Sequence, residues 1–492
     1  MYRCHYCGNL ETEAGEESYF NCNSPHGELC GGCEKLRLLN KQILDAKAAL
    51  EDLLNQRREL KSKLNHQHKS MIHRLPVEIS SLIFEFYVVL AARISDTRGG
   101  LVLGAVCHTW RQIAWSSPRL WTRLDIDFGP SIKETHIQLV IEWLGRSGRL
   151  PLSISIDLES KPDGFPEELL SILFEGINNC SSRCYSLFLA DCHLLTTPVL
   201  DPHATSSFQF DHPSFDWGSL INFSASSIFL DELFDIIQQA PQLMQCDFEA
   251  ISNRSPLFID GPVPICHSHI KSIGIEFGDE PMEVFLETIT LPSLTELSLK
   301  VFHEELPTQA FVSFLTRSLC HLQDLSIHNA TVTDEELVRV LRATSSLTSL
   351  KLGSLWTESA IPLVPFYRAL AAHLPTTNGR SHTVAESFLP LLMEFVFTGG
   401  AQIPWKLIPN FFVPLNETPG APRRPLARVC INCNQRIDEP IHYISKETLC
   451  QLQDFIDEGV CIILQLHVGN TVTSEDLIQL SIKRLEESKE NE

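Results

Sequence analysis

Two pairs of cysteines near the start of the sequence have the spacing of metal ligands. Cys4 and Cys7 form one Cys-x-x-Cys pair, and Cys30 and Cys33 form another. Tetrahedral zinc takes four thiolate or imidazole ligands, and short Cys-x-x-Cys turns supply them two at a time. The spacing predicts a structural zinc module over residues 1–33, because a stretch with few apolar residues needs a metal to order itself. Flexible free thiols are the alternative interpretation.

Catalytic chemistry has no comparable signal. The sequence contains no glycine-rich phosphate loop, no Gly-x-Ser-x-Gly elbow and no His-Glu-x-x-His pair. A third cysteine pair, Cys430 and Cys433, is followed only by irregularly spaced cysteines and histidines, which is not typical of a zinc site. We therefore expect a chain that is not an enzyme and that needs no cofactor other than structural zinc.

Length, composition and charge disfavour several classes of protein. The chain has 492 residues, of which 43% are hydrophobic, so it can bury a large core spread over several domains or one elongated array. Its 39 Lys and Arg against 61 Asp and Glu give a net charge of −22, which disfavours nucleic acid as the main partner. No apolar run reaches the roughly 18–20 residues of a membrane span. Sixteen cysteines without a secretory signal predict reduced thiols, so we expect a cytoplasmic location, a nuclear one, or both.

Residues 34–70 contain no Gly or Pro and repeat apolar side chains every seven residues. The seam combines Leu36, Ile43, Leu50, Arg57 and Leu64 with Leu39, Ala46, Leu53 and Leu60. This pattern predicts one long helix that forms a coiled coil through residues 36–64, either by self-association or with a partner helix. An amphipathic helix packed on its own domain is the alternative. Arg57 on the seam would weaken a buried dimer core.

The most specific motif lies in residues 71–125. It begins with Leu-Pro-Val-Glu-Ile at residues 75–79, continues with Val-Cys-His-Thr-Trp at 106–110 and closes with Pro-Arg-Leu-Trp at 118–121. Pro76 suits the first turn of a helix, where its missing N–H costs nothing. Apolar residues recur after it at helical spacing, namely Ile79, Leu82, Ile83, Phe86 and Leu90. We expect a small bundle of short helices with apolar residues left over for a partner.

These three submotifs resemble the F-box, and the whole layout resembles fungal F-box-like proteins that carry a preceding heptad helix and a long repeat-bearing tail. The sequence departs from a minimal F-box between residues 84 and 101, where the interval is longer. The resemblance implies docking onto the Skp-type adaptor of a cullin-based ubiquitin ligase. It also implies the adaptor-facing residues, which are Leu75, Pro76, Ile79, Ile83, Phe84, Val106, Cys107, Trp110 and Leu120. Cys107 would act there as a small hydrophobic residue rather than a nucleophile.

A Leu-x-x-Leu-x-Leu pattern recurs after residue 150. Clear copies begin at Leu294, Leu322 and Leu347, and weaker ones at Cys184, Leu220, Leu243, Ile270 and Leu392. The starts from Leu220 to Leu347 are 23 to 28 residues apart, within or near the period of leucine-rich repeats. We expect an irregular leucine-rich-repeat-like solenoid over residues 150–415, with an ordinary α/β domain as the alternative. A Pro-rich basic stretch at 419–425 predicts a linker to a C-terminal extension over 426–492.

Strand residues between the inward leucines would lie on the exposed face of such a solenoid. The charged and polar members of this set are Asp247, Glu249, Glu276, Glu296, Lys300, Asp324, His328 and Lys351. Their mixture of signs is typical of a protein-binding surface, and we predict that they contact a protein target. Ordinary solvated strand residues are the alternative for any single position.

Together these patterns predict an α+β or α/β-solenoid fold, in which an N-terminal helical region (heptad helix plus F-box bundle) precedes the repeat domain. The implied function is substrate recognition for a Skp–cullin–F-box ubiquitin ligase. In that function the F-box binds the adaptor, the adaptor joins the cullin scaffold, and the repeats hold an unidentified protein substrate. A non-ligase scaffold that uses both parts for assembly is one alternative. A nucleic-acid-associated regulator acting through the cysteine module and the locally basic heptad helix is another.

Overall fold

The computed structural model describes most of the chain. The residues it describes are 31–67, 75–93, 98–127, 133–158, 166–190, 193–194, 209–210, 215–226, 228–251, 263–277, 282–301, 305–355, 363–371, 388–400, 402–413, 423–435, 440–468 and 474–490. The chain divides into two compact units, residues 1–84 and 85–492, and the boundary falls inside one helix. None of the helices in the described ranges is both long and apolar enough to cross a bilayer.

The N-terminal region is helical. Its elements are α1 (Gly31–Gln67), α2 (Val77–Arg93), α3 (Gly99–Val106), α4 (His108–Trp115) and the 3-10 helix η2 (Pro118–Trp121). Helix α1 covers nearly the whole predicted heptad segment, as the absence of Gly and Pro led us to expect. The seam residues Leu50, Leu53 and Leu60 are exposed along it. The predicted coiled coil through residues 36–64 therefore stays a prediction.

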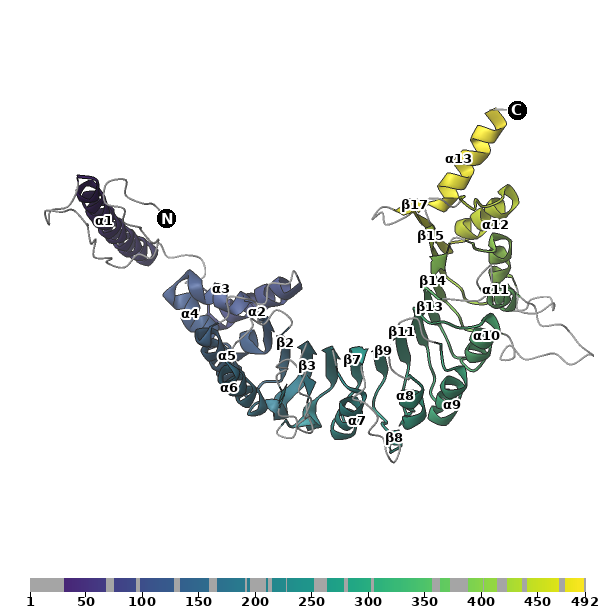
Figure 1. The fold of residues 1–492 in the computed structure, drawn as a ribbon, viewed down its shortest axis with the longest axis horizontal. Helices are drawn as coiled ribbons and strands as arrows, with labels where there is room; N and C mark the ends of the chain where they lie inside the picture. The colour runs from purple at the N-terminus through teal and green to yellow at the C-terminus, as the bar shows by residue number, and fades with distance from the viewer. Residues whose placement is uncertain are drawn as a thin grey trace, which may run out of the picture. The chain divides into compact units, whose positions relative to one another are not determined.

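Unit 85–492 is built on one thirteen-stranded sheet (Figure 1). In spatial order the strands are β1 (Arg123–Asp127), β2 (Leu152–Asp157), β3 (Cys184–Ala190), β6 (Asn222–Ser226), β7 (Gln245–Ile251), β9 (Ser272–Phe277), β11 (Glu296–Val301), β12 (Asp324–His328), β13 (Ser349–Gly353), β14 (Glu394–Gly400), β15 (Arg428–Gln435), β16 (Cys461–Val468) and β17 (Ser474–Asp476). Neighbouring strands are parallel except β16 and β17. The strands have the same order in the sheet as along the chain. Each crossover therefore adds the next strand at the same growing edge of the sheet. Within the described strands, β1 and β17 end the row and the sheet does not close into a barrel.

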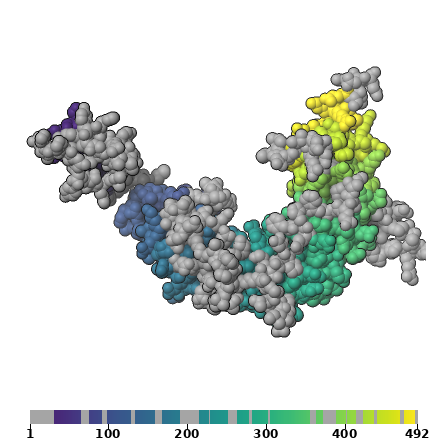
Figure 2. Space-filling model, viewed as in Figure 1, coloured from purple at the N-terminus to yellow at the C-terminus, as the bar shows by residue number. Residues whose placement is uncertain are grey.

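Helices and short turns fill the connections between these strands. They are α5 (Glu134–Arg146), α6 (Glu167–Asn178), η3 (Ser181–Arg183), η5 (Trp217–Ser219), α7 (Leu230–Gln239), α8 (Met282–Thr288), α9 (Thr308–Ser318), α10 (Asp334–Arg342), α11 (Val364–Ala371), η7 (Trp405–Phe412) and α12 (Lys446–Asp457). Helix α13 (Leu477–Glu490) follows the last strand. Two short ladders join β4 (His193–Leu194) to β5 (Gln209–Phe210) and β8 (Ile265–Cys266) to β10 (Ile289–Thr290). Consecutive helices from α8 to α11 contact one another. In Figure 2 the atoms of the green part of the chain lie close together.

Buried and accessible residues alternate along the strands. In β2 the side chains of Leu152, Ile154 and Ile156 are buried, whereas Ser153 and Ser155 between them are half-buried. A parallel sheet covered on both faces reads as a continuous apolar run, so strict alternation indicates that only one face is covered. The helices cover the apolar face, as Figure 1 shows, and the opposite face is polar and open. We refer to it below as the open face.

The second and third positions of every copy of the leucine pattern lie on a strand of this sheet. The central residues of seven copies are consecutive register partners, namely Phe223, Cys246, Ile273, Leu297, Leu325, Leu350 and Phe395. The sheet also extends beyond the predicted range of 150–415, since β1 precedes it and β15 and β16 follow it. Strand β1 buries only Leu124 and Ile126, and β15 buries Val429, Ile431 and Cys433, so neither shows the leucine signal. Strand β16 does bury Leu464 and Leu466.

Arg424 lies in the stretch that the sequence predicts as a linker, yet it is buried. Its guanidinium donates hydrogen bonds to the backbone carbonyls of Leu370, Phe388, Leu389 and Phe411 at 3.1, 2.8, 2.9 and 3.1 Å. Burial lowers the pKa of this group to about 10. The four carbonyls belong to α11, η7 and the segment before β14, so one side chain ties three parts of the fold together. This part of the predicted linker is packed core.

Replacing Arg424 with Met should lower the free energy of unfolding by about 3–5 kcal/mol, because four buried carbonyls lose a charged donor. Arg423 provides a matched control. Its ion pair with Glu458 spans 3.0 Å and both side chains are 55% exposed, so Arg423→Met should change the unfolding free energy by less than about 1 kcal/mol. Thermal unfolding of the two variants measures the difference. Equal effects would contradict the structural role of Arg424.

His267 is a second buried polar residue whose protonation affects the fold. Its Nε2 lies 3.0 Å from the carbonyl of Ala240 and its Nδ1 accepts the backbone N–H of Ile270 at 3.3 Å. The carbonyl can only accept, so Nε2 carries a proton. Nδ1 accepts an N–H and so carries none, which leaves the ring neutral. Burial lowers the pKa of His267 below its ordinary value of 6.5.

Acid should therefore destabilise the fold through His267. Below about pH 6.5 the unfolded chain takes up a proton that the folded ring resists, so the free energy of unfolding falls as the pH falls. We expect the unfolding temperature to drop less between about pH 7.5 and 5.5 in His267→Gln than in the parent protein. His269→Gln, at an exposed neighbouring position, should keep most of the parent's pH dependence, because burial lowers the pKa of His267 more than the charge of His269 does. The same flattening in both variants would refute the assignment.

Candidate functional site

Helix α2 begins at the predicted proline and leaves a row of apolar residues uncovered. The carbonyl of Pro76 accepts the backbone N–H groups of Ile79 and Ser80 at 3.1 Å, so the proline opens the first turn. Ile79, Ile83, Phe86 and Leu90 recur at spacings of four and three residues, which places them on one side of the helix. All four are exposed, Phe86 by 68% and Leu90 by 61%. Such a row is unusual for a helix that only packs on its own domain.

Helices α3 and α4 meet at an extended residue, Cys107. Its sulfur accepts the backbone N–H of Trp110 at 3.5 Å and so caps α4. The Nε of Arg111 donates to the carbonyl of Gly104 at 2.8 Å, which holds α4 against the end of α3. Val106 at the end of α3 is 54% exposed. The Val-Cys-x-x-Trp motif thus builds a helical corner with an apolar side chain at its outer edge.

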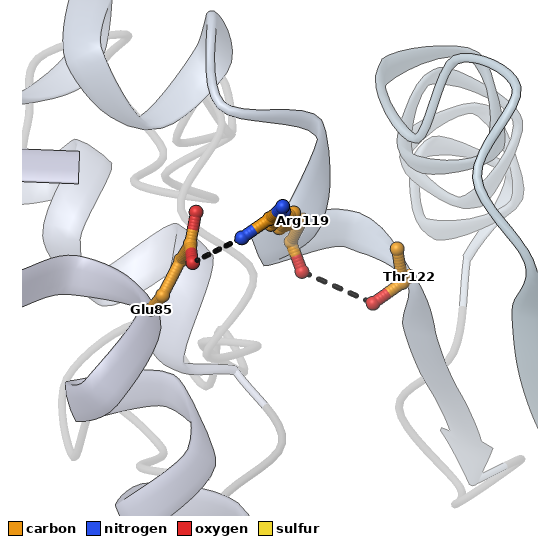
Figure 3. A network of polar contacts seen from close by, with 3 residues as sticks. All are labelled: Glu85, Arg119 and Thr122. Carbon is orange, nitrogen blue, oxygen red and sulfur yellow. Dashed lines mark hydrogen bonds and ion pairs between the residues drawn. The ribbon is translucent and has the colours of Figure 1, made fainter. Parts of the chain in front are cut away.

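The 3-10 helix η2 closes this region and is tied to α2. Arg119 forms an ion pair with Glu85 at 3.3 Å, and the hydroxyl of Thr122 donates to the carbonyl of Arg119 at 3.0 Å (Figure 3). The Arg119 side chain is 71% exposed, so the ion pair contributes at most about 1 kcal/mol. Leu120 and Trp121 on the same turn are buried. Burial of these two residues therefore holds η2 in place more than its charges do.

Trp121 joins the helical region to the first repeat of the sheet. Its indole N–H donates to the carbonyl of Ala114 at 2.8 Å, and its ring packs edge-on against Trp143 of α5 with centroids 4.8 Å apart. The guanidinium of Arg146, also on α5, lies 4.9 Å from the Trp121 ring and 4.5 Å from the Trp115 ring. We call these four side chains, Trp115, Trp121, Trp143 and Arg146, the tryptophan junction.

The residues predicted to face an adaptor differ in accessibility. Leu75, Pro76, Ile79, Ile83 and Val106 are exposed, and Cys107 and Trp110 are half-buried. Phe84 and Leu120 are 1% and 2% exposed, so both serve the core of the protein and are not available to a partner. Phe86 and Leu90 are exposed but were not assigned to the adaptor, although their helical spacing already placed them beside Ile79 and Ile83.

A cavity of about 530 Å³ opens on the open face between β6 and β13. Gly274, Ser298 and Ser326 are consecutive register partners and form its floor. Five of the eight predicted target-binding residues line it, namely Asp247, Glu296, Lys300, Asp324 and Lys351. The remaining three, Glu249, Glu276 and His328, lie on the same strands outside its lining. The structure therefore gathers most of the predicted set around one depression.

Charged residues of the open face pair across neighbouring strands. The Nζ of Lys300 on β11 lies 3.1 Å from a carboxylate oxygen of Glu276 on β9, and this hydrogen bond raises the pKa of Lys300. Arg428 on β15 and Glu394 on β14 form a second pair at 3.2 Å. His328 bonds to the hydroxyl of Ser326 at 2.8 Å. Burial and the neighbouring lysines lower the pKa of His328, so it is neutral near pH 7.

The predicted zinc ligands fall mostly outside the described residues. Cys4, Cys7 and Cys30 lie there, and Cys33 is buried in the first turn of α1. In the part of the chain that the structure describes, no three Cys, His, Asp or Glu residues cluster as metal ligands. The zinc module stays a prediction.

Comparison with known proteins identifies the helical region. A family model described as F-box-like matches residues 72–127. Residues 72–127 form an F-box-like domain. No curated protein matches the chain. The match confirms the F-box resemblance predicted for 71–125, and an F-box-like domain indicates a role in protein–protein interaction.

The tryptophan junction should stabilise the F-box-like domain. Trp121→Ala removes a buried indole and should lower the free energy of unfolding by about 3–5 kcal/mol. Trp115→Ala is the matched control, because Trp115 is 47% exposed and mainly loses its contact with Arg146, worth about 0.5–1 kcal/mol. Urea unfolding followed by circular dichroism compares the two. A loss for Trp115→Ala as large as that for Trp121→Ala would contradict the assignment.

Proposed function

We propose that this chain is the substrate-recognition subunit of a Skp–cullin–F-box-type ubiquitin ligase. The F-box-like domain docks onto a Skp-type adaptor, and the open face of the sheet holds a protein target. The observation that carries the proposal is the F-box-like domain itself, whose helices leave apolar residues exposed instead of burying them. The chain forms no bond in this function, because other subunits transfer the ubiquitin.

The exposed residues have the chemistry of a helix-on-helix interface. Ile79, Ile83 and Phe86 on α2 and Val106 on α3 present aliphatic and aromatic surface to solvent. A few such anchors supply most of the affinity in protein interfaces, since burial removes apolar surface from water. An adaptor surface rich in apolar side chains would gain from covering them.

The connection between domain and sheet supports a proximity mechanism. Trp121 and Arg146 lock η2 onto α5, the helix that follows the first strand of the sheet. A target bound on the sheet would be held by the same chain that docks onto the adaptor. Such positioning raises the effective concentration of target lysines near a ubiquitin-carrying enzyme.

We further propose that the sheet is an irregular leucine-rich-repeat solenoid. Parallel strands follow one another in chain order, and the central repeats are 23 to 28 residues apart. The central strands bury alternate apolar residues under helices on one side only. A single such unit cannot close its core, so stacking of neighbours is what stabilises it.

Adaptor binding provides the test. Full-length chain co-expressed with a Skp-type adaptor and a cullin should co-purify with both. Ile79→Asp and Val106→Asp should each weaken adaptor binding by about 2 kcal/mol or more, because a carboxylate replaces an interface anchor. Val263→Asp is the control, since Val263 is 74% exposed outside the F-box-like domain and should leave recovery unchanged.

The outcomes separate the alternatives. Adaptor recovery that survives both domain variants, with thermal stability unchanged, would refute the interface. Recovery of the adaptor without the cullin would favour a scaffold that uses the F-box-like domain only for assembly.

A further inference from the structure

Two carboxylates at the rim of the cavity lie directly opposite each other. Glu296 on β11 and Asp324 on β12 are register partners, and neighbouring strands lie about 4.8 Å apart. Among the residues that the structure describes, no cation is within ion-pair distance of either. Like charges at opposite positions of a sheet destabilise it. A bound cation would relieve this repulsion.

Two other carboxylates of the open face are paired. Glu276 and Glu394 each have a basic partner on the next strand, Lys300 and Arg428. In the described part of the chain, Glu296 and Asp324 have no such partner, and both line the cavity. Their carboxylates therefore border a hollow that another molecule can enter.

A third carboxylate leans into the same depression. A side-chain carbon placed on Gly274 would lie 2.4 Å from Oδ1 of Asp247, so the carboxylate occupies the space above the glycine. Glycine at this position therefore lets Asp247 reach from β7 across β9 toward the floor. The hydroxyl of Ser298, the next residue along that row, offers a further acceptor at the bottom.

The charges of the lining do not cancel. Lys300 already forms an ion pair with Glu276. The other charged residues of the lining are one cation, Lys351, and three carboxylates, Asp247, Glu296 and Asp324. A guanidinium carries five N–H donors in a planar fork and no acceptor, which matches several carboxylates and hydroxyls around one hollow. A volume of about 530 Å³ lies in the usual range for binding sites and leaves room for the backbone that carries the side chain.

We propose that the cavity binds an arginine side chain of the protein target. This inference rests on the proposed function, in which the open face holds that target. Asp247, Glu296 and Asp324 accept the guanidinium hydrogen bonds, and the small residues of the floor admit it. Lys351 opposes the bound charge from the β13 side and limits the affinity.

Peptide pools test the proposal with the full-length chain immobilised. Each pool has random uncharged residues around one fixed central residue, which is arginine, citrulline, lysine or glutamate. Citrulline has the shape of arginine without its charge. The arginine pool should bind at least about tenfold more tightly than the citrulline pool, equivalent to about 1.4 kcal/mol.

Three variants assign the effect to the cavity. Glu296→Gln with Asp324→Asn should reduce binding of the arginine pool to the citrulline level, and Lys351→Met should strengthen it. Glu283→Gln with Glu287→Gln removes the same charge from exposed positions on α8, on the covered side of the sheet. This control pair should bind the arginine pool as the parent does.

Each contrary result overturns the proposal. Equal binding of the arginine and citrulline pools would show that charge is not recognised. An equal loss in the control pair would show general attraction to an acidic protein, and preference for the glutamate pool would show a cationic site. Adaptor recovery measured on the same protein separates the two proposals: arginine selection without adaptor binding would refute only the proposed function, and adaptor binding without arginine selection would refute only this inference.

Discussion

The fold of unit 85–492 depends on burying one face of a sheet and leaving the other in water. The inward residues of each strand pack under helices, and the strand beside it supplies the backbone hydrogen bonds. No single strand and helix could bury this apolar surface alone, so each repeat is stable only against its neighbours. The polar open face follows from the same constraint, because the side chains between the buried ones must point away from the helices.

The ends of such a row need protection, since an unpaired strand edge invites association with other chains. At one end, β17 runs antiparallel to β16 and is only three residues long. At the other end, β1 follows directly after Trp121, which packs on α5 through Trp143. The F-box-like domain is thus continuous with the core of the first repeat. This continuity couples the domain's stability to that of the sheet.

Local patterns in the sequence predicted much of this structure. The leucine motif located the central strands because buried residues recur at every second position of a strand, whatever the length of the loops between the strands. It missed β1, which buries only Leu124 and Ile126. The prolines beside Arg424 indicated a linker. The structural role of Arg424 instead depends on four hydrogen bonds to backbone carbonyls, and three of those carbonyls lie more than thirty residues away in the sequence. Phe84 and Ile83 are adjacent on one helix, and only tertiary packing decides which of them is buried.

The two candidate surfaces differ in the chemistry they offer. The F-box-like domain exposes aliphatic and aromatic side chains. Burial of such side chains gives affinity without much selectivity, because the hydrophobic effect is not directional. Surfaces of this kind can therefore let a family of chains share one partner. The open face exposes carboxylates, hydroxyls and glycine, where a mismatched group would leave a buried charge unpaired. Under the proposed function, selectivity for a target would therefore reside in the sheet. The net charge of −22 opposes self-association through the exposed apolar residues. What the open face binds would then depend on how each carboxylate is paired locally, more than on the total charge.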